Sequence, residues 1–310
     1  MNTARRLREL LREPGILVAP GAYDALSARI IQREGFPLVY VTGAGVTGGL
    51  LGMTDIGLIT MNEIVQVARN VAFAVDLPVI SDSDTGFGNA LNTRRSVREF
   101  ERAGIAGIHI EDQLWPKRCG HFEGKSVIPM EEMVQKIRAA CEVRENPDFV
   151  IIARCDAIAV EGFEPALARG DAYVEAGADM LFIEGPRTLQ QIEDIAIRFR
   201  ERIPLFFNMA ETGKTPYVPA EDLGGLGYKV VIYSAPARLA AAKAMTEVMR
   251  ELKRTGSTAA IKHKMITFAE WTDLTGLEEA RALERRYGTD QSRLPGFTLG
   301  EYELTPNVGK

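Results

Sequence analysis

The 310-residue sequence has few cysteines, no closely paired cysteines and no long apolar run. Its 3 cysteines, at positions 119, 141 and 155, form no Cys-x-x-Cys motif, which indicates reduced thiols and a cytoplasmic protein. No stretch approaches the ~18 consecutive apolar residues of a membrane-spanning helix. The first residues also lack the apolar core of a signal peptide. We therefore expect no interaction with membranes.

An excess of positive charge is also absent. The chain has 37 lysines and arginines against 42 acidic residues, a net charge of −5. This balance gives no general attraction to nucleic acid or anionic lipid, so local cations or a metal must bind any anionic substrate. A hydrophobic content of 46% and a charged content of 25% are typical of a globular protein with a substantial core.

Short apolar runs alternate with segments of helical periodicity along most of the chain. The runs are Ile16–Ala19, Leu38–Thr42, Pro78–Ser81, Gly107–Ile110, Phe149–Ala153, Met180–Ile183, Pro204–Asn208 and Lys229–Tyr233. Eight such alternations predict a (β/α)8 TIM barrel. No Gly-x-Gly-x-x-Gly follows the first run, which disfavours a dinucleotide-binding fold. We predict one barrel domain over residues 1–310, whose helical region 240–310 contributes to an oligomer interface.

Polar residues follow the predicted strands, at the end where barrel active sites lie. They are Tyr23, Asp24, Tyr40, Thr42, Gly43, Ala44, Gly45, Asp82, Asp84, Glu111, Asp112, Arg154, Asp156, Glu184, Asn208 and Glu211. Each acid alone is equally well explained as a helix cap or an ion-pair partner. Together they would repel one another unless a cation lies among them. In an extended chain Asp82 and Asp84 face the same side, and oxygen ligands without His or Cys predict Mg²⁺, with Mn²⁺ as the alternative.

Three of these positions have two interpretations each. The Gly-containing segment Thr42–Gly45 is either a tight turn or a backbone cradle for an anion. Arg154 is either paired with neighbouring acids or free to clamp a substrate carboxylate, and a metal among the acids favours the clamp. Tyr40 either packs inside the barrel or accepts a proton from the substrate.

The segment Pro116–His121, Pro-Lys-Arg-Cys-Gly-His, opens a polar loop after a predicted strand. A thiol beside cations and glycine indicates a lowered pKa and a mobile position, as a proton donor or nucleophile requires. We therefore predict that Cys119 is catalytic. Of the remaining cysteines, Cys141 is expected in the core and Cys155 is expected to line or back the site without reacting. The remaining histidines, His109 and His263, are expected to be structural.

These residues, in this order, resemble the isocitrate lyase/phosphoenolpyruvate mutase superfamily. The similarity runs from about residue 6 to about residue 286 and rests on five motifs. They are Tyr-Asp-Ala-Leu-Ser-Ala at 23–28, Asp-x-Asp-x-Gly-x-Gly at 82–88, His-Ile-Glu-Asp-Gln at 109–113, Lys-Arg-Cys-Gly-His at 117–121 and Asn-Met at 208–209. The resemblance implies a barrel whose eighth helix is exchanged between subunits, in a homotetramer built from dimers.

The resemblance also implies roles for particular residues. Mg²⁺ would be held, mainly through water, by Asp55, Asp82, Asp84 and Glu111. A substrate carboxylate would lie on Thr42, Gly43, Ala44 and Arg154, with Glu184 and Asn208 nearby. The catalytic group would comprise Cys119 as the acid, Tyr40 as the base, Glu184, and the cations Lys117, Arg118 and His121. The implied reaction is a retro-aldol or retro-Claisen cleavage of a small 2-hydroxy dicarboxylate, dimethylmalate-like or methylisocitrate-like.

Other positions leave the substrate open. Bacterial 2-methylisocitrate lyases carry Arg-Pro-Asn-Lys where this chain has Phe-Glu-Gly-Lys at 122–125, which weakens the case for a third substrate carboxylate. The same segment resembles carboxyphosphonoenolpyruvate phosphonomutase. Cys155 and Ser234 replace a customary Thr and Pro close to the expected pocket. The alternatives are therefore a P–C bond enzyme, an oxaloacetate decarboxylase or hydrolase, or a barrel that only binds a metabolite.

Overall fold

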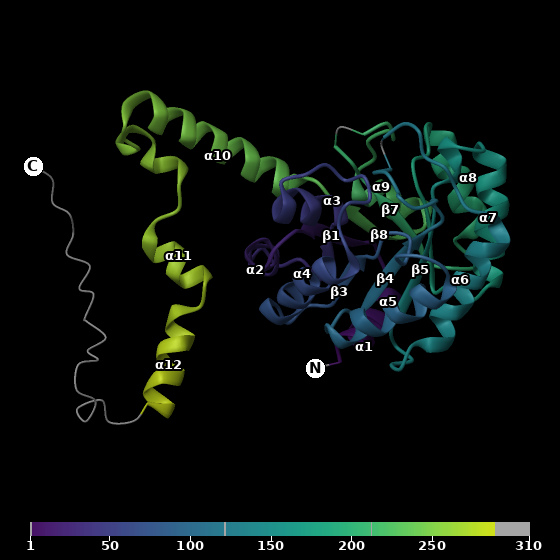
Figure 1. The fold of residues 1–310 in the computed structure, drawn as a ribbon, viewed down its shortest axis with the longest axis horizontal. Coiled ribbons are helices and arrows are strands. Elements are labelled where there is room, and N and C mark those ends of the chain that lie inside the picture. The colour runs from purple at the N-terminus through teal and green to yellow at the C-terminus, as the bar shows by residue number, and fades with distance from the viewer. Residues whose placement is uncertain (1, 121, 212, 289–310) are drawn as a thin grey trace, which may run out of the picture. The chain divides into compact units, whose positions relative to one another are not determined.

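Eight parallel strands close into a barrel in chain order, each hydrogen-bonded to the next and β8 to β1 (Figure 1). The computed structural model describes residues 2–120, 122–211 and 213–288. The strands are β1 (Leu17–Ala22), β2 (Val39–Val41), β3 (Val79–Asp82), β4 (Gly107–Glu111), β5 (Val150–Cys155), β6 (Met180–Ile183), β7 (Leu205–Asn208) and β8 (Tyr228–Tyr233). Each overlaps a predicted strand, and the predicted (β/α)8 barrel is confirmed.

The helices that connect the strands surround the closed sheet (Figure 1). The α-helices are α1 (Thr3–Arg12), α2 (Ala25–Arg33), α3 (Gly43–Val46), α4 (Met61–Ala74), α5 (Ala90–Arg102), α6 (Met130–Val143), α7 (Phe163–Glu175), α8 (Leu189–Phe199), α9 (Ala220–Leu226), α10 (Pro236–Thr255), α11 (Phe268–Leu274) and α12 (Leu277–Tyr287). The shorter segments are a π-helix, η1 (Thr47–Leu51), and the 3₁₀ helices η2 (Ala157–Ala159) and η3 (Ala259–Lys264). Among the described residues, no helix is long and apolar enough to cross a membrane.

Strand alternation divides the core into two layers. Outward-facing residues such as Val41 and Ile151 pack against the surrounding helices. Inward-facing residues, including the large rings of Phe182 and Phe206, fill the barrel. Helix α1 belongs to this inner layer because its buried face, which includes Leu7, packs with the residues inside the barrel. It closes the barrel at the N-terminal ends of the strands.

The same alternation places polar side chains at the opposite end. In most strands, the inward position two residues beyond the last apolar one is polar. These positions are Tyr40, Asp82, Arg154, Glu184, Asn208 and Ser234, and β4 contributes both His109 and Glu111. Side chains separated by tens of residues in the sequence therefore converge on the C-terminal mouth of the barrel.

The C-terminal region divides from the barrel. The chain forms two compact units, residues 1–258 and a unit that begins at Ala259 and contains α11 and α12. One barrel domain over residues 1–310, with the helical region 240–310 contributing to an oligomer interface, stays a prediction. Helix α10, in the first unit, has no buried residue, although it follows β8 in the chain, where the eighth barrel helix is expected. The exchange of this helix between subunits stays a prediction.

Candidate active site

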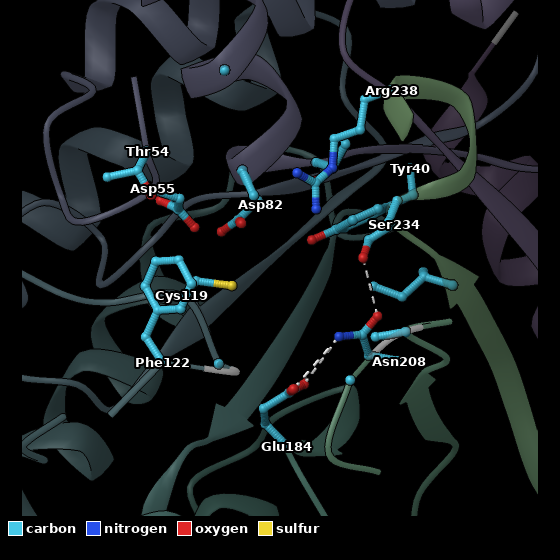
Figure 2. Close-up of a pocket in the computed structure, with 18 of the residues that line it drawn as sticks. Tyr40, Thr54, Asp55, Asp82, Cys119, Phe122, Glu184, Asn208, Ser234 and Arg238 are labelled. Carbon is cyan, nitrogen blue, oxygen red and sulfur yellow. Dashed lines mark hydrogen bonds between the residues drawn. The ribbon is translucent and has the colours of Figure 1, made fainter. Parts of the chain in front are cut away.

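A cavity of about 380 Å³ opens at the C-terminal mouth of the barrel (Figure 2). Ten of the predicted site residues line it: Tyr40, Thr42, Ala44, Asp55, Asp82, Lys117, Cys119, Arg154, Glu184 and Asn208. Of the other predicted residues, Asp84 and Glu111 lie buried next to the lining, and His121 is outside the described residues. The strand-end pattern therefore located the cavity.

A buried ammonium group lies among the predicted metal ligands. The Nζ atom of Lys117 is 2.6 Å from Oδ1 of Asp55 and 2.8 Å from Oδ1 of Asp84. Asp84 does not follow the extended geometry that we predicted from its spacing to Asp82, because its φ of 47° turns the backbone into the left-handed region. Its carboxylate nevertheless reaches the acid cluster through Lys117. No three acidic, His or Cys side chains among the described residues are arranged to hold a metal directly.

Gly43 contacts an acid of the site rather than presenting its N–H to the cavity. Its N–H donates to Oδ2 of Asp82 over 3.2 Å. A β-carbon at position 43 would lie 2.4 Å from the same oxygen, so only glycine fits there. Gly43 therefore contacts Asp82 in this structure, and its binding of a substrate carboxylate stays a prediction. Its neighbours Thr42 and Ala44 do line the cavity.

Burial sets the protonation of the acids. Burial raises the pKa of Asp84 to about 7, although Lys117 opposes the shift. Burial also raises the pKa of Glu111 well above its usual value, against the effect of Arg154. For Asp82, burial acts in the same direction, but the permanent charges of Lys117 and Arg154 help to hold its pKa below the usual range. The acids therefore differ in their protonation although they lie in one cluster.

Arg154 is paired and also faces the cavity. Its Nε donates to Oδ2 of Asp156 over 2.8 Å, and its Nη2 donates to Oδ1 over 3.2 Å. Nε also lies 3.3 Å from Glu111, and the guanidinium carbon lies 5.0 Å from the ring centre of Phe182. Nη1 has no hydrogen-bond partner among the described residues. The ion pair thus fixes the guanidinium and leaves one nitrogen for a ligand.

Tyr40 is held by a histidine that we had expected to be only structural. The phenol oxygen lies 2.8 Å from Nε2 of His109, which in turn is 3.7 Å from Oδ1 of Asp82. Burial lowers the pKa of His109 to about 4, so the imidazole is neutral at physiological pH. Burial and the charge of Asp82 raise the pKa of Tyr40 well above its usual value. The period-2 pattern of β4, which aims His109 inward like Glu111, was the signal in the sequence.

Backbone hydrogen bonds hold the loop that carries the thiol. The N–H of Cys119 donates to the carbonyl of Asp55 over 3.1 Å, and its carbonyl accepts the N–H of Phe122 over 2.8 Å. Gln113 contacts both the N–H and the carbonyl of Arg118, over 2.9 and 2.8 Å. The guanidinium of Arg118 is exposed and donates to the carbonyl of Glu123. The structure therefore does not bring Arg118 into the cavity as predicted, whereas Lys117 is there.

The cavity wall opposite the loop of Cys119 is formed by the amide of Asn208 and the carboxylate of Glu184 (Figure 2). Nδ2 of Asn208 lies 3.5 and 3.4 Å from the two carboxylate oxygens of Glu184. Oδ1 of Asn208 accepts a hydrogen bond of 3.3 Å from the hydroxyl of Ser234. Ser234 therefore lines the cavity as expected. Cys155 faces outward instead and donates weakly to the carbonyl of Ala166, so its substitution does not change the lining.

The sequence analysis missed Arg238. It lies in the first turn of α10 and extends into the cavity, beside Tyr40 and Ser234 in Figure 2. Its buried Nε has no hydrogen-bond partner in the described part of the chain. The only signal was a cation that shortly follows the last predicted strand. A buried hydrogen-bond donor without a partner destabilises a folded protein. The unpaired Nε of Arg238 therefore indicates that a ligand binds there.

A barrel whose mouth combines clustered acids, two arginines and a thiol defines an enzyme for an anionic substrate. The model of the phosphoenolpyruvate phosphomutase family matches residues 7–253, and the chain belongs to this family. It is 47% identical over 291 residues to 2,3-dimethylmalate lyase of Eubacterium barkeri, covering 93% of this chain and 99% of that one.

Two further relatives extend the comparison. The chain is 45% identical to 2-methylisocitrate lyase of Aeropyrum pernix, over 88% of this chain and 87% of that one. A solved structure of oxaloacetate acetylhydrolase with 3,3-difluorooxalacetate superposes with a TM-score of 0.88 at 33% identity, covering 93% and 97% of the two chains. The family resemblance inferred from the sequence motifs is confirmed.

Proposed function

We propose that this protein is a Mg²⁺-dependent lyase for a small 2-hydroxy dicarboxylate, dimethylmalate-like or methylisocitrate-like. It breaks the C2–C3 bond to give a 2-oxo acid and a carboxylic acid. One observation carries the proposal: the thiol of Cys119 lines the same cavity as the guanidinium of Arg154. The cleavage needs a cation for the substrate carboxylate and a proton donor for C3. The similarity to dimethylmalate lyase supports the same choice.

The acid cluster fits a divalent cation. Oδ2 of Asp84 and Oε1 of Glu111 are buried and have no hydrogen-bond partner among the described residues. Such oxygens are costly unless a positive charge or a bound water satisfies them. We propose that Asp55, Asp82, Asp84 and Glu111 hold Mg²⁺, mostly through water. When bound, Mg²⁺ supplies the charge that polarises the carboxylate and hydroxyl oxygens of the substrate.

Two arginines suit the two carboxylates of a dicarboxylate. Arg154 offers Nη1, while its other edge is fixed by Asp156. Arg238 offers Nε, which lacks a partner among the described residues. We assign the C1 carboxylate to Arg154 because it lies beside the acids, and the distal carboxylate to Arg238. Thr42 and Ala44 complete the cavity wall on the side of Asp82.

The first chemical step removes the proton of the C2 hydroxyl. Tyr40 is protonated in the resting site because its pKa is raised. It therefore accepts the hydroxyl proton only as its own phenol proton passes to Nε2 of His109, which lies 2.8 Å away. The neutral imidazole is in the correct state to receive it. As the C2–O⁻ bond becomes a carbonyl, the C2–C3 electron pair moves onto C3 and its carboxyl group.

The second step adds a proton to C3. The thiol of Cys119 donates it, which leaves a thiolate and releases the carboxylic acid. Lys117, whose side chain is buried beside Asp55, contributes positive charge near the developing thiolate. Asn208 lies on the facing wall, where its amide donates to an oxygen atom of the product, and Glu184 orients that amide. Proton exchange with solvent then returns the thiol and His109 to their starting states.

The experiment that tests this function is a substrate panel with Mg²⁺. It compares 2,3-dimethylmalate, 2-methylisocitrate, carboxyphosphonoenolpyruvate and oxaloacetate, and it quantifies pyruvate, oxalate, CO₂ and phosphonate separately. We expect pyruvate in equal amount to the cleaved hydroxy acid. Phosphonate or CO₂ as the sole product would reject the lyase and favour the mutase or decarboxylase alternative.

One observation favours oxaloacetate hydrolysis as a second candidate. The hydroxyl of Ser234 lies in the cavity and donates to Asn208, which makes this wall polar. Hydrated oxaloacetate carries two hydroxyl groups on C2, and its cleavage uses the same proton acceptor and the same thiol donor. Oxalate and acetate would then replace pyruvate as products. A Ser234→Ala variant would lose oxaloacetate cleavage selectively if Ser234 binds the second hydroxyl.

The assembly and location are also proposals. Helix α10 leaves apolar side chains exposed on the surface of the single chain, including Leu239, Met245, Met249 and Leu252. A second copy of this chain would cover them through the exchanged helix, in a homotetramer built from dimers. The three cysteines form no disulfide, in keeping with a reducing cytoplasm.

A further inference from the structure

Lys125 is a buried ammonium that contacts two parts of the active site. Its Nζ donates to the carbonyl of Gly120 over 2.5 Å and to Oδ1 of Asp156 over 3.2 Å. Its side chain is only 4% exposed. Burying an ammonium group costs free energy unless its partners are well placed. The two partners therefore indicate what this lysine does.

The first partner fixes the thiol. Gly120 directly follows Cys119, whose own N–H is held by the carbonyl of Asp55. The backbone is thus anchored on both sides of the thiol, by Asp55 before it and by Lys125 after it. The two hydrogen bonds therefore restrain the backbone that carries the sulfur atom.

The second partner fixes the guanidinium. Asp156 is fully buried, and its N–H donates to Oδ1 of Asp112 over 2.8 Å, which ties it to the barrel. Its carboxylate accepts from Nε and Nη2 of Arg154 and, on Oδ1, from Lys125. Lys125 and Arg154 therefore share one carboxylate. Oδ1 of Asp156 accepts a hydrogen bond from each of the two cations.

We propose that Lys125 is a positioning residue that sets the distance between the thiol of Cys119 and the guanidinium of Arg154. Its catalytic consequence rests on the proposed function, in which these two groups act on C3 and on the C1 carboxylate of one substrate. The geometric claim does not. A lysine that only neutralised Asp156 would need no bond to Gly120.

The test labels both groups in the substrate-free protein. Iodoacetamide modifies Cys119 and phenylglyoxal modifies Arg154, and peptide mass spectrometry gives each rate. We expect Lys125→Met to raise both rates at least threefold, since it removes the two hydrogen bonds while keeping the buried chain length. Lys125→Arg, which restores a cation with several donors, should return both rates to within twofold of wild type.

A matched control is available at the opposite end of the barrel. Like Lys125, Lys229 makes two hydrogen bonds through Nζ, in this case to the backbone carbonyls of Glu13 and Gly15. Lys229→Met should lower the thermal midpoint and leave both labelling rates unchanged. The proposal is overturned if Lys125→Met lowers only the thermal midpoint, or changes the rate at one group alone.

These readouts need no turnover. If the substrate panel yields no lyase activity while Lys125→Met changes both rates, the proposed function fails and the positioning role stands. If lyase activity is found, kcat/KM should fall in Lys125→Met, and Lys125→Arg should recover most of it. A lysine with a purely structural role would not produce this recovery together with altered labelling.

Discussion

Gly120 packs directly against Glu184: a β-carbon at position 120 would lie 2.7 Å from Oε1 of that carboxylate. The loop that carries the thiol therefore rests on the opposite wall of the cavity through a residue without a side chain. This contact sets how far Cys119 reaches over the substrate, because Gly120 is its neighbour in the chain.

Gly120→Ala should displace the thiol without unfolding the barrel. The added methyl group collides with Glu184, so the loop must move outward, and a displacement of about 1 Å can lower a rate by about 10²-fold. Steady-state kinetics and thermal unfolding measure the two effects. Gly225→Ala is the control, because its new β-carbon would meet no atom within 4 Å. An unchanged kcat/KM in Gly120→Ala would show that the loop position is not limiting.

Cys119→Ser should abolish C–C cleavage and leave binding intact. A serine hydroxyl is a far weaker acid than a thiol, so we expect kcat to fall by about 10²–10⁴-fold with little change in affinity. Cys141→Ser is the matched control, since burial raises the pKa of that thiol to about 11 and it lies on α6, outside the cavity. Turnover in Cys119→Ser near the wild-type rate would favour a mutase that needs no thiol acid.

Asp156 should contribute a pH-dependent part of the stability. Burial alone would raise the pKa of Asp156, but Arg154 and Lys125 hold it at about 2, below the ordinary 3.8. Because the folded-state pKa is the lower one, the contribution is complete above the unfolded-state pKa and is lost as pH falls from about 4 to 2. It amounts to about 2 kcal/mol.

Urea unfolding of wild type and Asp156→Asn at several pH values measures this contribution. The difference in the free energy of unfolding should be largest near neutral pH and shrink toward pH 2. Asp76→Asn, at an exposed position, should show no such trend. A difference that is constant with pH would mean that the ion pairs of Asp156 are not its source.

Mg²⁺ should stabilise the wild-type protein against heat. A ligand at 100 times its Kd stabilises a folded protein by about 2.7 kcal/mol, so the thermal midpoint should rise with added Mg²⁺ and fall again with EDTA. The double variant Asp55→Asn/Asp84→Asn should lose this response, while Asp76→Asn keeps it. An equal rise in the double variant would place the cation elsewhere.

Charges on the exposed apolar side of α10 should break the assembly. Met245→Asp/Met249→Asp puts two carboxylates where we propose that a second copy packs, and light scattering should report a mass below the tetramer. Lys243→Asp, on the same helix but outside the hollow lined by Met245 and Met249, is the control. A double variant with the wild-type mass would exclude this face from the interface.

Much of this architecture could be predicted because it depends on short-range patterns. The alternation of apolar runs and helical segments located all eight strands, and the polar strand ends located the cavity. The contacts that could not be predicted are made by residues in turns and at helix ends, where no regular periodicity tells which way a residue faces. Gly43 meets Asp82 instead of the cavity, and Arg238 reaches the site from the first turn of α10.

Contacts between residues far apart in the sequence could not be predicted either. No spacing rule indicates that Lys117 lies between Asp55 and Asp84, since these residues come from three different loops. The role of His109 required knowing that β2 and β4, which flank β3, aim Tyr40 and the imidazole at each other inside the barrel. Such contacts follow from the closed sheet and not from any local segment.

The position of helix α1 restricts how substrate enters the active site and how products leave it. Its buried face closes the barrel opposite the cavity, and the rings of Phe182 and Phe206 fill the space between. Substrate and both products must therefore use the same opening, beneath the loop of Cys119. The fragment nearer the opening has to leave before the one held on Arg154. We expect ordered release, with the 2-oxo acid departing last and competing with fresh substrate for the site.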